Sequence, residues 1–423
     1  MVNSPLKILV VGGGVAGITA AYVLSRAHRV TLLERNNYLG GHTNTRTVCD
    51  PLNPELQVDT GFIVCNPRNY TNFYRFLDQL NISRQPSDMS FGFSCELTGL
   101  QYMGPSVNEF LRAPGNLLNP RFLGMIAEQF RFNRRALRDF REGGLEDIPL
   151  GEYLRNLGTS RYFLDNYLAP LIGSIWSAPD SNALEFPAST FITFFNNHGM
   201  LEMSKRPQWQ TIVGGSQAYV RAFRKAFSGD LRTSCEARSI RRTDSGVFLN
   251  LAGSETERFD AVVLATHADE ALALLEDPSN EELAALSPWR YSRNRTVLHT
   301  DQSVLGPRRR LWAAWNYRRR IGAQPDSPVA ITYYMNRLQR LKAKYDYFVT
   351  LNCNEQIDQK RVLYEVEYTH PIYTPQSSIS QRAVRDLNGS RNTYFCGAYM
   401  RYGFHEDAVI SALDVASLFG ESL

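Results

Sequence analysis

Close to its N-terminus the chain reads Lys7-Ile8-Leu9-Val10-Val11-Gly12-Gly13-Gly14-Val15-Ala16-Gly17, an apolar, β-branched run that ends in a glycine-rich turn. A helix-forming segment, residues 18–25, follows, and a second apolar run over residues 30–33 ends at Glu34. The order is strand, helix, strand, with the spacing G-x-G-x-x-G at the first turn and an acid after the second strand. These features predict an α/β fold that opens with a Rossmann-type, dinucleotide-binding unit.

Each part of this unit has a physical role in holding a dinucleotide. Gly12 permits the tight turn, Gly14 lets the backbone approach a pyrophosphate, and Gly17 lets the helix pack closely on the strands. The helix N-terminus offers free N–H groups and partial positive charge to the phosphates, and Glu34 is expected to accept hydrogen bonds from ribose hydroxyls. The predicted contacts in this unit are Gly12, Gly13, Gly14, Val15, Ala16, Gly17 and Glu34.

Later segments read as returns to the same domain. Residues 235–251 and the buried run 259–265 are expected to be strands that complete its sheet, and residues 393–396 and 406–419 a last strand and helix. Alternating runs at 329–334, 347–351 and 362–368 predict an antiparallel sheet in a second, interleaved α+β domain. The predicted division gives the nucleotide-binding domain residues 1–66, 206–290 and 386–423, and the substrate domain residues 67–205 and 291–385.

The composition excludes several classes of protein. The 423 residues are 43% hydrophobic and 21% charged, which is typical of a globular protein, and no window holds the roughly 18 consecutive apolar residues of a membrane span. Six scattered cysteines and seven histidines show neither disulfide nor metal-ligand spacing. We therefore expect a cytoplasmic protein without a bound metal, and its oligomeric state is left open.

Two basic segments raise the question of an anionic partner. Residues 290–344 hold thirteen Lys or Arg against two Asp, and residues 121–141 alternate arginines with an apolar stripe at Phe122, Ile126, Phe130, Leu137 and Phe140. The stripe fits either a helix packed on its own domain or one lying on an anionic membrane surface. The arginine clusters match no nucleic-acid recognition motif, so nucleic acid is not expected as a partner.

Three neighbouring motifs resemble the FAD-dependent amine oxidase and phytoene desaturase superfamily: residues 12–34, Leu39-Gly40-Gly41-His42-Thr43-Asn44-Thr45 and Val58-Asp59-Thr60-Gly61-Phe62. The sequence is similar to one branch of it, often labelled predicted NAD/FAD-binding or amine oxidase-like proteins. That similarity extends through residues 87–91, 197–199, 207–209, 214–216, 315–317 and 403–407.

The resemblance implies FAD as the cofactor. The second glycine pair of such folds lies near the pyrophosphate and is usually followed by arginine, where this chain has His42, and an acid usual after the last strand's glycine is replaced by Ala398. Glu406 and Asp407 are expected to point away from the flavin and cap their own helix. The contacts implied beyond the first unit are Arg35, Gly40, Gly41, His42, Thr43, Asp59, Thr60, Gly61, Phe62, Gly215, Arg238, Gly397, Phe404, His405, Glu406 and Asp407.

The predicted activity is that of an FAD-dependent oxidoreductase that accepts a hydride at flavin N5 from an activated C–H bond. Many aromatic residues in the substrate segments favour a hydrophobic substrate, and members of the branch resemble proteins associated with fatty-acid modification. The resemblance thus implies dehydrogenation, desaturation or isomerisation of an unsaturated or modified fatty-acyl chain. The alternatives are an amine oxidase of a small or polyamine substrate and a non-catalytic, membrane-associated FAD-binding protein.

Catalytic and substrate-contacting residues are less clearly marked. His405, beside the implied flavin edge, is the candidate for handling a proton, and packing in the core is an equal alternative. The family resemblance adds His198, Trp209, Trp315 and Tyr317 as candidate residues of the substrate cavity.

Overall fold

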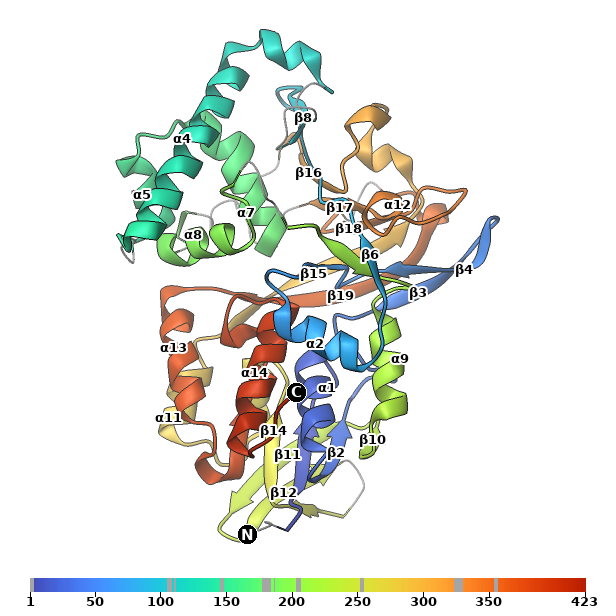
Figure 1. The fold of residues 1–423 in the computed structure, drawn as a ribbon, viewed down its shortest axis with the longest axis vertical. Coiled ribbons are helices and arrows are strands. Elements are labelled where there is room, and N and C mark those ends of the chain that lie inside the picture. Colours follow the sequence, from blue (N-terminus) through green and yellow to red (C-terminus); the bar gives the residue numbers. More distant parts are fainter. Residues whose placement is uncertain are drawn as a thin grey trace.

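The computed structural model describes residues 4–104, 109, 112–144, 148–176, 184–185, 187–202, 207–251, 255–322, 330–353 and 357–423. Figure 1 shows two stacked parts, with a parallel sheet and its helices below and a second sheet with a group of helices above. The chain passes between the two parts several times, so each part is assembled from separated segments.

The lower part is built on a five-stranded parallel sheet. Its central strand β1 carries four buried residues in succession after Lys7, as expected for a strand whose sheet is covered on both faces. The predicted strand-helix-strand unit is present, since β1 pairs with β2 in parallel and α1 starts directly after the glycine turn. The strands in order across the sheet are β10 (Asp230–Arg232), β2 (Arg29–Leu33), β1 (Lys7–Val11), β14 (Ala261–Leu264) and β20 (Thr393–Phe395).

Helices cover one face of this sheet and a second small sheet covers the other. The prediction that residues 235–251 complete the parallel sheet is wrong. Residues 237–251 form a separate antiparallel sheet with β13 (Glu257–Phe259), because each strand turns back tightly and pairs with the next one along the chain. The first face carries α1 (Val15–Leu24), α2 (Thr71–Gln79), α9 (Gln217–Ala226) and α14 (His405–Leu418). The second carries β11 (Ala237–Thr243), β12 (Gly246–Leu251), β13 (Glu257–Phe259), α10 (Ala268–Leu274), α11 (Asn280–Leu286) and α13 (Pro375–Asp386).

The upper part contains a seven-stranded sheet that is antiparallel except where β16 and β7 pair in parallel. The predicted alternating runs form three of its strands, although Val329, at the start of one run, lies outside the described residues. In order the strands are β19 (Val362–Ile372), β15 (Arg290–His299), β18 (Phe348–Leu351), β17 (Ile331–Tyr334), β16 (Trp315–Arg319), β7 (Phe91–Cys95) and β8 (Gln101–Gly104).

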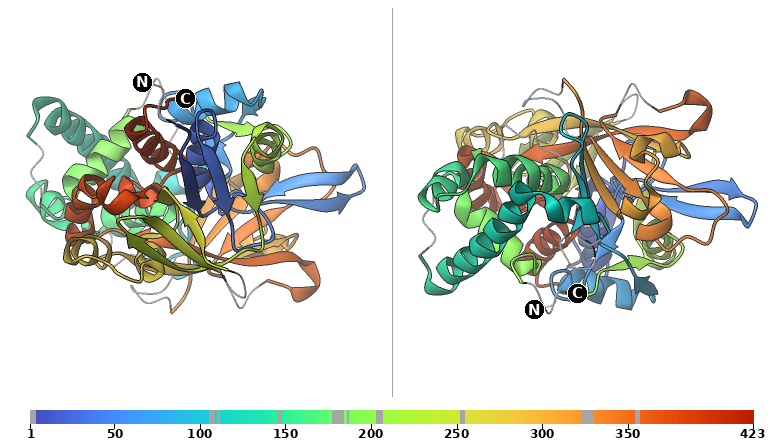
Figure 2. Two further views of the ribbon diagram at one scale, coloured as in Figure 1. Left: turned by 90° about the horizontal axis from the view of Figure 1, so that it is seen from below. Right: turned by 90° about the horizontal axis from the view of Figure 1, so that it is seen from above.

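A group of helices lies beside this sheet, as the view from above in Figure 2 shows. Phe122, Met125, Phe132 and Ala136 of α4 are buried, whereas Phe130 of the predicted stripe is 45% exposed. The predicted stripe was therefore wrong in part, because α4 has two apolar strips and only one of them faces the core. The helices are α4 (Pro120–Glu142), α5 (Leu150–Asn156), α6 (Arg161–Phe163), α7 (Ala169–Trp176) and α8 (Ala188–Asn197).

Smaller elements connect the two parts. The β3–β4 hairpin projects from one side of the molecule in both views of Figure 2. The remaining elements are β3 (Thr45–Asp50), β4 (Asn53–Asp59), β5 (Val64–Cys65), β6 (Arg84–Pro86), β9 (Gln210–Ile212) and α12 (Met335–Leu338), with short turns η1 (Pro114–Leu118), η2 (Leu164–Leu168), η4 (Gln302–Leu305), η5 (Arg309–Leu311), η6 (Gln359–Arg361), η7 (Ser390–Asn392) and η8 (Ala398–Met400).

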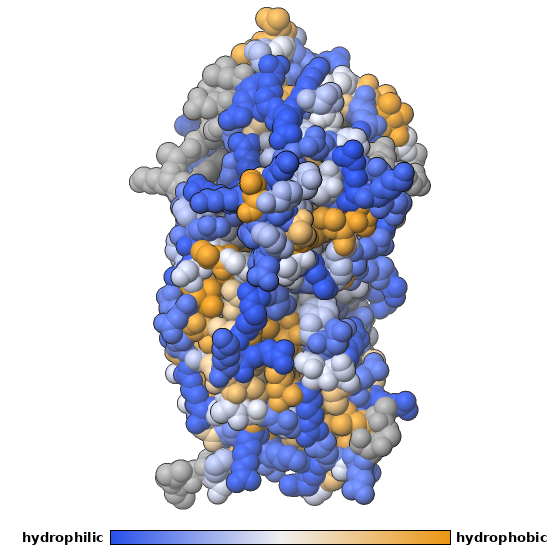
Figure 3. All heavy atoms as spheres, turned by 90° about the vertical axis from the view of Figure 1, so that its right-hand side faces the viewer, coloured by the Kyte–Doolittle hydropathy of each residue, from blue (hydrophilic) through white to orange (hydrophobic). Residues whose placement is uncertain are grey.

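Two helices that the predicted division assigns to the substrate domain pack on the lower part. Phe73 and Phe76 of α2 join the core beneath α1 and α14, and Val384 of α13 is buried with residues of α11. On the face shown in Figure 3, apolar patches are interrupted by hydrophilic side chains. Within the described ranges, no helix has the length and apolar character needed to cross a membrane.

Candidate functional site

A cavity of about 1070 Å³ extends from the glycine turn after β1 into the upper part of the molecule. Residues 11–16 and 40–42 line its middle, and residues 34–36, Tyr38 and residues 235–238 line one end. The other end is walled by aromatic and aliphatic side chains of the upper part. The volume of the cavity and its lining from both parts of the molecule therefore leave room for a nucleotide at one end and a second molecule at the other.

The glycine turn has open space over Gly14 and is tightly packed at Gly12 and Gly17. A Cβ atom on Gly14 would meet nothing within 4 Å, whereas one on Gly17 would lie 1.9 Å from the carbonyl oxygen of Gly12. Gly12 itself has φ +106°, which favours glycine. Helix α1 has no capping side chain and no acid in its first turn, so its first N–H groups are available to an anion.

The second glycine pair lies directly on this turn. The N–H of Gly40 donates to the carbonyl oxygen of Gly13 at 2.8 Å, and a Cβ on Gly41 would lie 3.4 Å from Cα of Gly14. Two glycine motifs separated by more than twenty residues therefore form one backbone-lined surface. The structure brings together Gly12, Gly13, Gly14, Val15, Ala16, Gly40, Gly41 and His42 along the cavity, while Gly17 lies outside the lining and serves helix packing.

Glu34 lies at the adjoining end of the cavity. Its Oε2 accepts a hydrogen bond from the N–H of Gly13 at 2.8 Å, and its Oε1 accepts from the N–H of Asn36 at 2.8 Å. The carboxylate thus fixes the glycine turn while it faces the cavity. Arg35 and Arg238 also line this end, and the side chain of Arg35 pairs with Glu270 at 2.8 Å.

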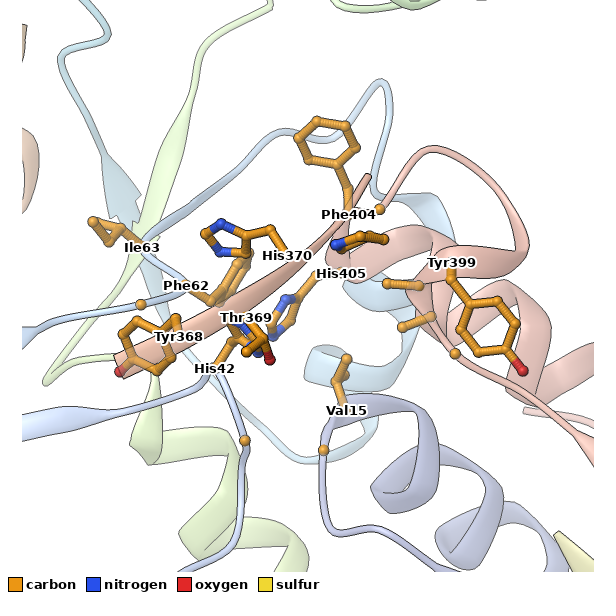
Figure 4. A pocket seen from close by; sticks show the side chains of 18 of the residues that line it. Val15, His42, Phe62, Ile63, Tyr368, Thr369, His370, Tyr399, Phe404 and His405 are labelled. Atoms are coloured by element: carbon orange, nitrogen blue, oxygen red, sulfur yellow. The ribbon is translucent and has the colours of Figure 1, made fainter. Parts of the chain in front are cut away.

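His42 is a buried imidazole with one unsatisfied nitrogen. Its ring lies on that of Tyr368, with ring centres 4.9 Å apart, and is 5.3 Å from the ring of His370. Burial, followed by the charges of His370 and His267, holds the pKa of His42 well below its ordinary value, so the ring is neutral. Among the described residues, Nε2 has no hydrogen-bond partner. Figure 4 shows His42 and His370 on the same side of the pocket.

No motif in the sequence pointed to the neighbours of His42. Tyr368 and His370 come from β19, more than three hundred residues away, and His267 follows β14. Burial lowers the pKa of His370 to about 4, so it too is neutral. Only the alternating run that predicted β19 pointed to this segment, and that pattern does not mark a site.

His405 is the first residue of α14 and lines the cavity beside Phe62 (Figure 4). Its Nε2 lies 3.0 Å from Oγ1 of Thr43 and 3.3 Å from the hydroxyl of Tyr219, and its ring is parallel to that of Phe62. Burial lowers the pKa of His405 to about 3. The group is therefore a neutral imidazole in a hydroxyl network rather than a cationic acid.

Three predicted contacts lie behind the cavity wall instead of lining it. Oγ1 of Thr43 lies 3.0 Å from Nε2 of His405 and shares a hydrogen bond of 2.6 Å with the hydroxyl of Tyr219. Asp59 accepts from Oγ1 of Thr45 at 2.5 Å and from the N–H of Ser216 at 2.8 Å, and burial raises its pKa to about 6.

Gly215 belongs to the same interior network. A Cβ on Gly215 would lie 2.4 Å from Cγ2 of Thr45, so this glycine permits close packing and has no contact with the cavity. Thr60, Gly61 and Phe62 of the same predicted motif do line the cavity, as do Gly397 and Phe404.

Glu406 and Asp407 are directed away from the cavity, but they cap different helices. Glu406 accepts from the N–H of Asn72 at 2.9 Å and of Phe73 at 2.8 Å, so it caps α2, and the prediction that it caps its own helix is wrong. Asp407 accepts from the N–H of Phe404 at 2.9 Å, as a cap of α14 itself, and burial raises its pKa to about 7.

The upper end of the cavity is apolar and aromatic. Trp209, Trp315 and His198 line it, and His198 is held by a hydrogen bond between Nδ1 and the carbonyl oxygen of Phe194 at 2.9 Å. Burial lowers the pKa of His198 to about 4. Tyr317 does not line the cavity, because it lies further along β16 and packs against Phe93 with ring centres 5.8 Å apart.

Acidic groups in this upper end are already engaged. Asp88 accepts from Nε of Arg337 at 2.6 Å, and Glu109 also has an interaction partner. Within the described part of the chain, no three His, Cys, Asp or Glu side chains converge as a metal site. The wall thus offers a substrate apolar surface with few polar groups.

The residues at the lower end fit a dinucleotide. An uncapped helix N-terminus, open space over Gly14, the unpartnered Nε2 of His42 and the carboxylate of Glu34 lie along one side of the same cavity. Phosphates accept hydrogen bonds. The helix N-terminus and His42 can donate to a phosphate, Gly14 leaves room for it, and the carboxylate of Glu34 can accept from a ribose hydroxyl.

Comparison with known proteins agrees with this geometry. Residues 15–341 match the family model of flavin containing amine oxidoreductases. The chain is 54% identical over 44 residues to an L-amino-acid oxidase of Bungarus fasciatus, covering 10% of this chain and 8% of that protein. It is 23% identical over 327 residues to an L-amino-acid oxidase of Siganus canaliculatus, covering 71% of this chain and 58% of that protein. The chain therefore spans less than two thirds of either curated relative.

Solved structures of similar fold cover nearly the whole chain. A CLA-producing fatty acid isomerase from P. acnes has a TM-score of 0.69 and 16% identity, covering 99% of both chains. A redesigned putrescine oxidase has a TM-score of 0.71 and 13% identity, covering 98% of both chains. These identities show a shared fold.

The family match and the site lead to one assignment. The match covers more than half of the chain, and the bound nucleotide of this family is a flavin. FAD is thus the cofactor of this family, and the open, uncapped glycine turn has the groups that its phosphates would need. The chain belongs to the flavin-containing amine oxidoreductases, a family of FAD-dependent oxidoreductases.

Proposed function

We propose that the chain removes a hydride from an activated C–H bond of a hydrophobic substrate, namely an unsaturated or modified fatty-acyl chain. Loss of a proton from the neighbouring carbon then gives dehydrogenation or desaturation, whereas return of the hydride to another carbon of the chain gives isomerisation without net oxidation. The observation that carries the proposal is the apolar, aromatic upper end of the cavity, which is continuous with the nucleotide end. When bound, FAD supplies the hydride acceptor, and the protein supplies position and electrostatics.

The lining of the upper end favours an acyl chain over a charged substrate. The side chains there include Met89, Phe91, Tyr102, Leu171, Ile175, Phe194, Trp209, Trp315 and Tyr333. A cationic amine would need a free carboxylate in addition to aromatic walls to replace its hydration. Asp88 is already paired with Arg337, and His198 is neutral, so neither is an uncompensated charge.

Hydride loss from an ordinary methylene is too costly for a flavin, so the substrate carbon has to be activated. A carbon next to a double bond meets this need within an otherwise apolar chain, because its developing charge is delocalised. Such a substrate requires exclusion of water and correct placement more than a charged partner. The similar fold of a fatty acid isomerase supports this substrate class.

His405 is the group of this chain best placed to assist. It faces the cavity with a neutral ring, and Thr43 and Tyr219 hold its Nε2. A neutral imidazole in contact with hydroxyl groups can pass a proton without carrying a charge itself. We assign it the handling of a proton beside the reacting carbon.

The test is anaerobic bleaching of the oxidised flavin in the purified holoprotein. A cis-monounsaturated fatty acid and its methyl-branched analogue are mixed with it in separate experiments, and putrescine and L-leucine in others. Bleaching by an acyl substrate supports the proposal. Bleaching by an amine alone overturns it and establishes the amine oxidase alternative, which the family match and the L-amino-acid oxidase relatives favour.

A variant pair links the result to the cavity. Leu171→Trp fills the upper end, whereas Leu283→Trp adds the same bulk at a position on α11 that is 42% exposed. We expect Leu171→Trp to slow bleaching by long acyl chains at least about tenfold and Leu283→Trp to leave it unchanged. A flavin that dithionite reduces but that no acyl chain or amine bleaches, with every acyl chain recovered with its double bond unmoved, would instead support the non-catalytic alternative.

A further inference from the structure

The outer face of the upper helices carries apolar side chains that nothing in the described chain covers. Leu118, at the end of η1, is 88% exposed, and Leu123 and Phe130 of α4 are each 45% exposed. Positions seven apart on a helix share a face, so Leu123 and Phe130 lie on one face of α4, and Leu118 directly precedes the N-cap residue of this helix. We call these three residues the outer strip. Figure 1 shows α4 at the edge of the molecule, away from the parallel sheet.

The outer strip is not the buried face of an ordinary amphipathic helix. Helix α4 already inserts Phe122, Met125 and Phe132 into the core on its other side. One helix therefore has an inner apolar face that is packed and a second apolar strip left in solvent. Contiguous exposed apolar side chains on a helix mark an interaction surface.

The flanks of the strip are cationic. Arg131 and Arg134 are exposed and form no ion pair within the described ranges, and α4 holds six arginines against three acids, Glu128, Asp139 and Glu142. Glu128 accepts from the N–H of Ser160 at 2.7 Å, and Asp139 pairs with Arg135 of the same helix at 2.8 Å, which leaves Arg131 and Arg134 as charges without an ion-pair partner in the described ranges. The charge complement of this face is an anionic surface.

The strip is also close to the cavity wall in the fold. Tyr102, which lines the cavity, has its ring centre 5.5 Å from that of Phe122, and Phe122 is the neighbour of Leu123 along α4. The inner side of the first turn of α4 thus supports the substrate end of the cavity, while its outer side is the strip.

From these contacts we propose that the outer strip docks on an anionic phospholipid bilayer, with its leucines and phenylalanine in the interface and the arginines at the headgroups. Apolar side chains bordered by arginines are what an interfacial helix presents to such a surface. If the substrate is an acyl chain, as proposed above, docking would bring the substrate end of the cavity to the membrane that holds it. That last step rests on the proposed function, whereas docking itself does not.

Vesicle binding of the holoprotein tests the proposal without any turnover. Sedimentation is compared between vesicles of phosphatidylcholine alone and vesicles that also contain phosphatidylglycerol. We expect binding to the anionic vesicles to be at least about tenfold stronger, and to weaken as salt is added. Equal binding to both, or none to either, overturns the proposal.

Two variant pairs locate the surface. Leu118→Ser/Leu123→Ser removes apolar contacts from the strip, and Leu52→Ser changes another leucine that is 69% exposed. Arg131→Glu/Arg134→Glu reverses charge at the strip, and Arg224→Glu does so on α9. Each strip variant should lose at least about fivefold in vesicle binding with its flavin absorbance intact, and each control should bind as the parent does. Equal losses in strip variants and controls would contradict the assignment.

A second copy of the chain is the competing occupant of this face. Two copies placed strip to strip would bring arginines together, which opposes such a dimer. Light scattering measures the oligomeric state of the parent and of Leu118→Ser/Leu123→Ser. The proposal is overturned if the parent is a dimer that does not bind vesicles and the variant is a monomer. Flavin bleaching by a dispersed acyl substrate in the absence of vesicles reports on the proposed function separately.

Discussion

The imidazole ring of His405 lies flat against the phenyl ring of Phe62, with ring centres 3.6 Å apart and planes inclined by 11°. The two residues come from opposite ends of the sequence, and both line the cavity. Since Nε2 of His405 is also held by Thr43, the ring has a fixed position and orientation. A fixed, neutral imidazole is suited to proton transfer at a defined point rather than to general electrostatic attraction.

His405→Ala should slow substrate-driven flavin reduction at least about tenfold while FAD stays bound, because the proton-handling group is removed. Stopped-flow measurement of flavin absorbance gives the rate. His405→Phe is the matched control, since it keeps the stacking on Phe62 and removes the nitrogens. Recovery of the parent rate in His405→Phe would show that the ring serves packing alone.

Gly14→Ala and Gly17→Ala should separate cofactor binding from folding. A methyl group on Gly14 enters open space at the phosphate position, so FAD affinity should fall at least about a hundredfold while the thermal unfolding midpoint of the apoprotein is retained. A methyl group on Gly17 collides with the backbone of Gly12, so this variant should lose stability first. Fluorescence titration with FAD and apoprotein melting curves provide the measurements. Equal FAD affinity of Gly14→Ala and the parent would place the phosphates elsewhere.

FAD should bind more tightly at pH 6 than at pH 8, and His42 should be the cause. Without ligand the pKa of His42 lies well below its ordinary value. A phosphate beside Nε2 would raise it, so FAD binding takes up a proton and is favoured by acid. We expect a change in the dissociation constant of at least about threefold across this range. His42→Gln should abolish the dependence, and His28→Gln, a change outside the cavity, should keep it.

Asp407 should make the protein less stable as pH rises. Burial raises its pKa in the folded state to about 7, from an ordinary value of 3.8. The folded state therefore binds this proton more tightly; its stabilising contribution is complete below about pH 4 and is lost as pH rises through 7. The loss is on the order of a few kcal/mol.

Asp407→Asn cannot ionise, so it should gain stability over the parent at pH 8 and little at pH 4, as measured by urea unfolding. Asp414→Asn, on the exposed side of the same helix, is the control and should behave like the parent at both values. An Asp407→Asn protein with the parent's pH dependence would show that Asp407 remains ionised in the fold.

Local sequence patterns predicted those helices, strands and turns that depend mainly on residues close by in the chain. The strand, glycine turn and helix around Gly12 follow from adjacent sequence, and the helix expected at residues 406–419 is observed at His405–Leu418. The family resemblance was confirmed by the match over residues 15–341. Such features need no knowledge of distant contacts.

Long-range contacts account for what sequence reasoning missed. Glu406 reads as a local helix cap, yet the N-terminus it caps belongs to α2, more than three hundred residues earlier. His370 reaches His42 only because β19 crosses the cavity. Tyr317 shares a strand face with Trp315, but strand alternation does not say where along that face a cavity ends.

The order of strands in the parallel sheet has a consequence for biosynthesis. β1 forms within the first residues made, but the edge strand β20 arrives nearly four hundred residues later, and His405 follows it. A growing chain on the ribosome would thus display the glycine turn long before the cavity wall from β20 and α14 is made. We expect newly made polypeptide to mature into a yellow protein only after synthesis has passed α14, so a chain that stops before β20 should stay colourless.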